Sequence, residues 1–232
     1  MHTTTFFPRR RAFTLVELIT ATALITILAG IIVGVLGSAR DRADATKGMS
    51  ILRNNGAALN LYLADNGTRL PGPLWPGQIA YYDPANLSNG RIVNMLKDYL
   101  DIPDYTAASV IEAFVPPAYT AVMAEEGLQS SSARVYVMNT PISVDAVDYQ
   151  PFGFPGTSSN PDSRTGPLRM NALPPDVTET WAMMDADQQH PNVSGRPWGN
   201  STPTEPIYGK FRHALFFDGR VERIEIDDTP SP

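Results

Sequence analysis

Four carboxylates stand out in this chain because their positions could give them a chemical task. Glu17 stands at the edge of an apolar segment, where an ionised side chain is costly unless it has a partner or a function. Asp185 and Asp187 lie two residues apart beside a Pro-rich loop, and Asp218 precedes a glycine in a turn-like sequence. Because carboxylates and loop carbonyls are the ligands that Ca²⁺ takes, these three aspartates are candidate calcium ligands. The alternative interpretation is that they form turns at strand ends.

No catalytic constellation is evident in the sequence. The chain has three His and no Cys, and it lacks Gly-x-Ser-x-Gly, His-Glu-x-x-His and the glycine-rich phosphate-binding motifs. We therefore expect a protein that is not an enzyme and has no resident cofactor other than the candidate calcium. The absence of Cys excludes disulfides and Cys-ligated metal sites. The chain has 24 acidic and 18 basic residues, and this acidic balance argues against a nucleic-acid partner.

The apolar segment has the length of a membrane-spanning helix. Residues 18–39 carry no charge and are rich in Leu, Ile, Val and Ala. As a helix they measure about 33 Å, against about 30 Å for the hydrocarbon core of a bilayer. The run is longer than the roughly 7–15 apolar residues of a typical signal peptide. Three arginines at residues 9–11 precede it, which predicts a cytoplasmic N-terminus and an extracytoplasmic remainder.

The same helix is predicted to continue beyond the membrane. No Pro occurs between Arg9 and Leu70, and apolar residues recur near helical spacing between residues 49 and 63. Asn66, Gly67 and Pro71 then give a stop signal. We expect one long helix within residues 13–66 that crosses the membrane at about residues 15–37.

The remaining residues predict a small antiparallel sheet packed on the second half of the helix. The expected elements are a short helix at 89–100, strands at 110–115, 134–138 and 178–184, and Pro-rich loops at 152–167 and 188–206. Residues 213–226 predict a hairpin that turns at Asp218-Gly219, after which Val221, Ile224 and Ile226 alternate with charged residues. The expected class is α+β, with a leader at 1–12, the long helix at 13–66 and a globular head at 67–232.

The start of the apolar segment resembles a known processing signal. The run Arg11-Ala12-Phe13-Thr14-Leu15-Val16-Glu17-Leu18, behind a short basic leader, is similar to the N-terminal signal of type IV prepilins and type II secretion pseudopilins. The resemblance implies that a prepilin peptidase cuts between Ala12 and Phe13 and methylates the new Phe13 amine. Ala12 departs from the Gly that the family usually has before the cut. The resemblance further implies that Glu17 neutralises the Phe13 amine of a neighbouring subunit, whereas judged alone it could simply lie among lipid headgroups.

The C-terminal region carries a second resemblance. Residues 178–226 are similar to a bacterial group of pseudopilin-like proteins recognised by a His, nine residues and Asp-Gly. In this chain Tyr208 stands where that His would be relative to Asp218-Gly219, His213 is displaced, and Arg220 replaces a frequent second His.

These resemblances imply a structural subunit of a type II secretion pseudopilus or a type IV pilus-like filament. The implied partners are the prepilin peptidase, other copies of the chain, minor pseudopilins, an assembly platform in the bacterial inner membrane, and the bilayer itself. The implied topology is a single pass with a cytoplasmic N-terminus and a periplasmic head. The alternative is a membrane-anchored binding or adhesion module that does not polymerise.

Overall fold

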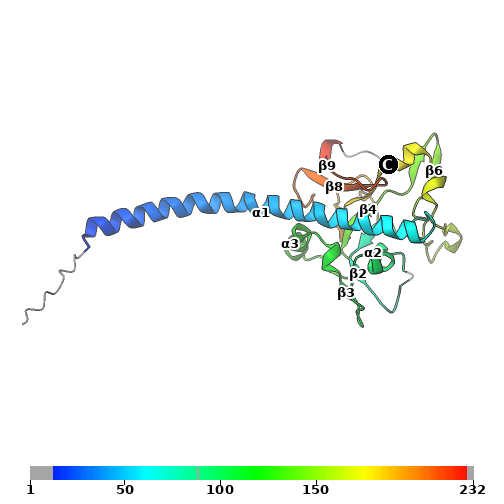
Figure 1. Cartoon of the computed structure of the whole chain (residues 1–232), viewed down its shortest axis with the longest axis horizontal. Coiled ribbons are helices and arrows are strands. Elements are labelled where there is room, and N and C mark those ends of the chain that lie inside the picture. Colours follow the sequence, from blue (N-terminus) through cyan, green and yellow to red (C-terminus); the bar gives the residue numbers. More distant parts are fainter. Residues whose placement is uncertain (1–12, 88, 229–232) are drawn as a thin grey trace, which may run out of the picture. The chain divides into compact units, whose positions relative to one another are not determined.

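One long helix dominates the N-terminal part of the chain (Figure 1). The computed structural model describes residues 13–87 and 89–228, so the leader at 1–12 lies outside the described residues. Helix α1 (Leu15–Asp65) is continuous over 51 residues, which confirms the predicted long helix. The chain divides into two compact units, one ending at Arg42 and one beginning at Ala43.

The end of α1 follows the predicted stop signal. The amide of Asn66 still donates to the carbonyl of Tyr62 at 2.9 Å. The amide of Thr68 then donates to the carbonyl of Leu63 at 2.8 Å, which satisfies a carbonyl that the helix itself leaves open. The hydroxyl of Tyr99 donates to the Asp65 carboxylate at 3.1 Å and ties this end of the helix to the head.

The second unit is built on one antiparallel sheet of five strands in the order β1-β4-β7-β8-β9. Its strands are β1 (Gly77–Ile79), β4 (Arg134–Met138), β7 (Trp181–Asp185), β8 (Phe211–Phe216) and β9 (Val221–Glu225). Two-stranded ribbons join β2 (Tyr81–Tyr82) to β3 (Ser109–Val110) and β5 (Ile142–Val144) to β6 (Val147–Tyr149). The predicted α+β class and the predicted strand at 134–138 are confirmed.

Short helices fill the connections between strands. They are α2 (Ile92–Leu96), which continues as a 3₁₀ turn, α3 (Pro117–Glu126) and α4 (Pro175–Thr178). The predicted helix at 89–100 is confirmed in α2 and its 3₁₀ extension. Helix α3 was not predicted, although Pro117 in its first turn and Gly127 after its end are ordinary start and stop signals.

The predicted strand at 110–115 is wrong over most of its length. Only Val110 of this segment belongs to β3, and Glu112–Phe114 form a 3₁₀ turn. The apolar run reflects burial instead: Ile111 and Phe114, three residues apart, both lie in the core. An apolar run of this length does not by itself distinguish a strand from a buried turn.

Both faces of the five-stranded sheet are covered. A large cluster joins Leu52 and Leu59 of α1 to Leu215 of β8, and a smaller cluster contains the neighbouring residues Ala214 and Phe216. Successive side chains of a strand point to opposite faces, so β8 contributes to both clusters. The sheet therefore packs on the C-terminal part of α1 through one face and on the loops after β7 through the other.

The β8–β9 hairpin is confirmed, with one correction. Gly219 adopts a φ of 89° in the turn, a conformation that favours glycine, and an added Cβ would lie 2.9 Å from Nδ2 of Asn60 on α1. Val221 packs against the large cluster and Ile224 against the small one. These residues are three apart and so face opposite sides of β9, and Ile226 lies beyond the strand. The expected simple alternation is therefore wrong.

Candidate functional site

The first turn of α1 is closed by a reciprocal pair of side chains. The Oε2 atom of Glu17 accepts hydrogen bonds from the amide of Thr14 at 2.8 Å and from its hydroxyl at 2.9 Å. The amide of Glu17 donates in return to Oγ1 of Thr14 at 3.2 Å. This is the capping box of the Ser/Thr-x-x-Glu pattern, which satisfies two amides that a helix start leaves open. The Thr14-x-x-Glu17 spacing is visible in the sequence, although the pattern of residues had drawn attention only to Glu17.

The capping box lies directly beside the predicted cleavage position. Phe13 is the first described residue, and its side chain is 87% exposed. Ala12, the residue predicted to precede the cut, lies outside the described residues. Glu17 accepts the amide of the residue that follows Phe13, so its carboxylate lies close to the position where cleavage would create an amine. The carboxylate of a single chain therefore already has hydrogen-bond partners.

The apolar part of α1 presents its side chains outward. Leu24, Ile25, Leu28 and Ile31 are each more than half exposed. The hydroxyls of threonines in this part donate to carbonyls within the same helix, from Thr20 to Val16, Thr22 to Ile19 and Thr26 to Thr22. Such internal bonds leave no hydroxyl unsatisfied in an apolar surrounding. By length and composition α1 can cross a membrane.

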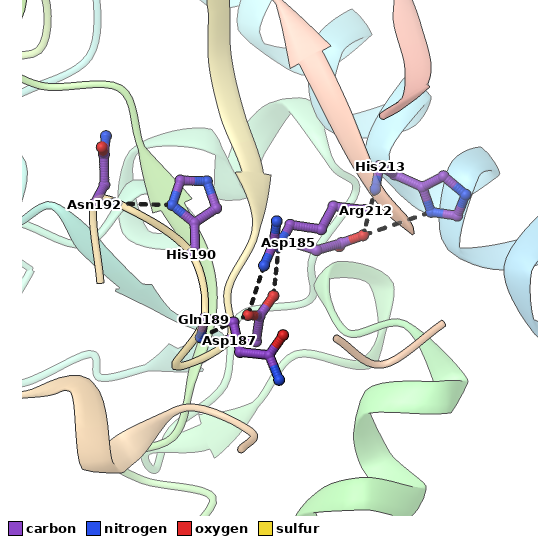
Figure 2. Close-up of polar contacts among 7 residues, drawn as sticks. All are labelled: Asp185, Asp187, Gln189, His190, Asn192, Arg212 and His213. Carbon is purple, nitrogen blue, oxygen red and sulfur yellow. Dashed lines mark hydrogen bonds and ion pairs between the residues drawn. The ribbon is translucent and has the colours of Figure 1, made fainter. Parts of the chain in front are cut away.

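A second group of polar residues lies buried at the end of β7 (Figure 2). Asp187 and Arg212 form a two-point ion pair, with Nε to Oδ2 at 2.6 Å and Nη2 to Oδ1 at 2.8 Å. Both side chains are only 1% exposed. Oδ1 of Asp187 also accepts the amide of Gln189 at 2.9 Å. A buried arginine requires such a carboxylate, so Asp187 is occupied by a structural task.

Asp185 contacts the neighbouring strand rather than a loop. Its Oδ2 accepts the amide of His213 at 2.7 Å and lies 3.6 Å from Nδ1 of the same residue. Burial raises the pKa of Asp185 to about 7, although the His213 amide acts in the opposite direction. Burial, with a smaller effect from Arg223 and Arg53, lowers the pKa of His213 to about 4. The imidazole is therefore neutral at pH 7, and this contact is not an ion pair there.

His190 completes the buried polar group. Its Nδ1 accepts the amide of Asn192 at 3.0 Å (Figure 2). Its ring meets the ring of Trp181 edge to face, with centroids 5.3 Å apart. Burial lowers the pKa of His190 to about 3, with a smaller effect from Arg212. A neutral histidine packed on an indole stabilises the loop that follows β7.

The three candidate calcium ligands do not form one site. Asp187 is paired with Arg212, Asp185 accepts the amide of His213, and Asp218 accepts the amide of Arg220 in the hairpin turn. Within 13–87 and 89–228, no group of three or more His, Asp or Glu side chains is arranged to hold a metal ion. The expected convergence is therefore wrong. The turn interpretation fits Asp218, while Arg212 is a partner that the sequence analysis did not identify.

The residues of the second resemblance meet in space. The rings of Tyr208 and His213 lie 4.5 Å apart between centroids, and Tyr208 is stacked on Phe211 at 5.2 Å. Tyr208, which stands at the expected histidine position, thus packs against the displaced His213 at the start of β8. The arrangement is a packing contact, and the assignment to that pseudopilin-like group stays a prediction.

Comparison with known proteins identifies the N-terminal signal. The family model described as the prokaryotic N-terminal methylation motif matches residues 7–33. This motif is the prepilin-type signal of type IV pilins and pseudopilins, so the chain carries the signal of a prepilin peptidase substrate. The match contains Phe13, Thr14 and Glu17. No curated protein and no solved structure matches the chain.

Proposed function

We propose that the chain is a pilin-like structural subunit of a type II secretion pseudopilus or a type IV pilus-like filament. The observation that carries the proposal is the methylation motif at residues 7–33. Within this motif, Phe13 directly precedes the capped start of the apolar helix. A prepilin peptidase cuts before Phe13 and methylates the new amine, and the apolar part of α1 stays in the inner membrane. The leader is cytoplasmic and the head is periplasmic.

Assembly in this proposal exchanges the partners of Glu17. In the single chain the carboxylate is satisfied by Thr14, which limits the cost of placing it at the edge of the bilayer. In the filament the same carboxylate meets the Phe13 amine of a neighbouring copy. A charge pair in a low-dielectric core is far less costly than either charge alone, so the pair fixes the register between subunits. Minor pseudopilins and an inner-membrane platform are the further partners.

Glu17→Ala in cells that produce filaments tests the proposal. The variant keeps Phe13 and the apolar helix, so it should insert and be cut normally, but it should yield less than about a tenth of the wild-type filaments. The matched control is Glu125→Ala, which removes an exposed carboxylate of the head. Sheared filaments are compared at equal membrane levels of each variant. Normal filaments from Glu17→Ala would refute the pairing mechanism, and a wild-type chain that is processed but never found in filaments would favour the anchored binding module.

A further inference from the structure

A pocket in the head has a composition that the proposed filament does not explain. Its volume is about 480 Å³, within the range of small-molecule sites. The side chains that give it its character are two tryptophans, Trp75 and Trp198, and two arginines, Arg91 and Arg134. All four are partly exposed, so the pocket opens to solvent.

The wall of the pocket is held in place by a buried glutamine. Gln78 of β1 is 1% exposed; its Oε1 accepts the amide of Ile92 at 2.7 Å, and its Nε2 donates to the carbonyl of Gly90 at 3.2 Å. The amide of Trp75 donates to the same carbonyl at 3.0 Å. Gly90 has a φ of 75°, and a Cβ there would lie 2.8 Å from Cδ1 of Trp75. These contacts fix the wall of the pocket without the help of a ligand.

The charge of the lining is positive, in contrast to the chain as a whole. The lining among the described residues contains both guanidiniums and no Asp or Glu, whereas the chain has a net charge of -6. Burial lowers the pKa of both arginines, and the charge of Arg91 lowers that of Arg134 further. Asp83 and Tyr81 act in the opposite direction on Arg91, as Tyr119 does on Arg134. A bound anion would offset two like charges in a partly desolvated place.

Several hydrogen-bond donors of the lining have no acceptor among the residues that the structure describes. Nη1 of Arg134 donates to the carbonyl of Gly77 at 2.9 Å, and Nη1 of Arg91 donates to that of Tyr81 at 2.9 Å. A guanidinium has five N–H donors, so both arginines retain donors for a ligand. Within the described part of the chain, the buried atoms Nε of Arg134 and Nδ2 of Asn89 have no acceptor. An acceptor-rich, negatively charged group would complement these donors.

The aromatic residues add a surface for a ring. The guanidinium of Arg134 lies over the ring of Trp198, 5.0 Å from its centroid, and Trp75 is supported edge to face by Phe154 with centroids 5.3 Å apart. Indole faces pack well against flat apolar surfaces, including the C–H face of a pyranose. The exposed hydroxyls of Ser131 and Ser132 at the rim supply neutral hydrogen bonds. Charge, ring faces and hydroxyl partners together match a carboxylated sugar.

We propose that this pocket binds an anionic glycan through a hexuronic acid residue, whose carboxylate lies between Arg91 and Arg134 and whose ring lies against a tryptophan. This activity goes beyond the structural role and does not depend on filament formation. It gives the head a function of its own in recognising acidic polysaccharides.

Tryptophan fluorescence of the full chain in detergent micelles tests the proposal. The chain has three tryptophans, of which Trp181 is buried, so the other two dominate any change on binding. The probe is digalacturonic acid, compared with neutral galactobiose, inorganic phosphate and AMP. Digalacturonate should bind saturably and at least tenfold more tightly than the other three. Arg91→Gln and Arg134→Gln should each weaken its binding about tenfold or more, as expected for a lost charged hydrogen bond.

Two controls keep the test decisive. Arg223→Gln removes a half-exposed arginine that is also stacked on an aromatic ring, Phe211, outside the pocket, and should change the Kd less than twofold. Far-UV circular dichroism establishes that each variant is folded, and Arg91→Gln provides the test if Arg134→Gln does not fold. Absence of digalacturonate binding, equal binding of galactobiose, phosphate or AMP, or an equal loss in Arg223→Gln would overturn the proposal.

Discussion

Thr14 and Glu17 hold each other through three hydrogen bonds at the first turn of α1. The pair lies within the methylation motif, immediately after Phe13. The residue with an implied task in assembly is therefore also part of the helix cap of the single chain. Any change in the partners of Glu17 during assembly would loosen this cap. The stability of the first helical turn would then differ between the single and the assembled subunit.

The first prediction concerns Thr14→Val, which keeps the shape of the side chain and removes its hydroxyl. The first turn should lose about 1 kcal/mol, the usual effect of losing an N-cap side chain. The amides of Glu17 and Leu18, which both donate to Thr14, should then exchange with solvent about fivefold faster in detergent micelles. Thr14→Ser retains the hydroxyl and serves as the control. Equal exchange rates in Thr14→Val and wild type would show that the cap does not operate in solution.

The second prediction concerns the buried pair of Asp187 and Arg212. Asp187→Asn leaves the guanidinium without its counter-charge, so the free energy of unfolding should fall by about 3–5 kcal/mol. Asp218→Asn breaks a half-exposed pair with Arg220 and should cost less than about 1 kcal/mol. Denaturant unfolding followed by near-UV circular dichroism measures both. Equal small losses in the two variants would contradict the structural role of the buried pair.

The third prediction concerns the pH dependence of stability at Asp185. Its pKa is about 7 in the folded state and about 3.8 in an unfolded chain. Between these values the folded state binds the additional proton, so the contribution of this carboxyl is fully present below pH 4 and is lost as the pH rises through 7. Asp185→Asn retains an acceptor for the His213 amide and does not titrate. Its Tm relative to wild type should therefore rise between pH 4.5 and pH 7.5.

Differences between variants isolate this effect. His190 and His213 have lowered pKa values, so their contribution to stability rises with pH up to about 6.5, opposite to that of Asp185. Wild type and Asp185→Asn share this contribution, and it cancels in their difference. A Tm difference for Asp185→Asn that stays constant over this pH range would mean that this buried carboxyl is already ionised at low pH.

The sequence predicts local features of this chain well, because short patterns determine them. The uncharged run, the stop at Asn66-Gly67 and the Asp218-Gly219 hairpin all depend on residues close together in the chain. The capping box at Thr14 and Glu17 was equally readable from its spacing. The α+β class followed from the order of these elements.

Features that depend on strand order were not accessible in the same way. Asp187 and Arg212 are separated by 25 residues and meet only because β7 pairs with β8. The sequence shows no partner for this aspartate, and the residue pattern therefore predicts a calcium ligand there. The pocket of Trp75, Arg134 and Trp198 likewise combines distant segments of the chain. Arg134 of β4 lines this pocket with Gly77 of β1 because the two strands pair.

Mass spectrometry of the N-terminus of the mature protein, isolated from the membranes of its native host, tests whether the prepilin-type signal is processed. The mature chain should begin at Phe13, carry one methyl group on its amine and retain the whole of α1. Cells without the prepilin peptidase should instead contain the chain with residues 1–12 attached and no methyl group. A mature protein that begins at Met1, or one cut within α1 after Ala23, would show that the chain is not processed as a prepilin.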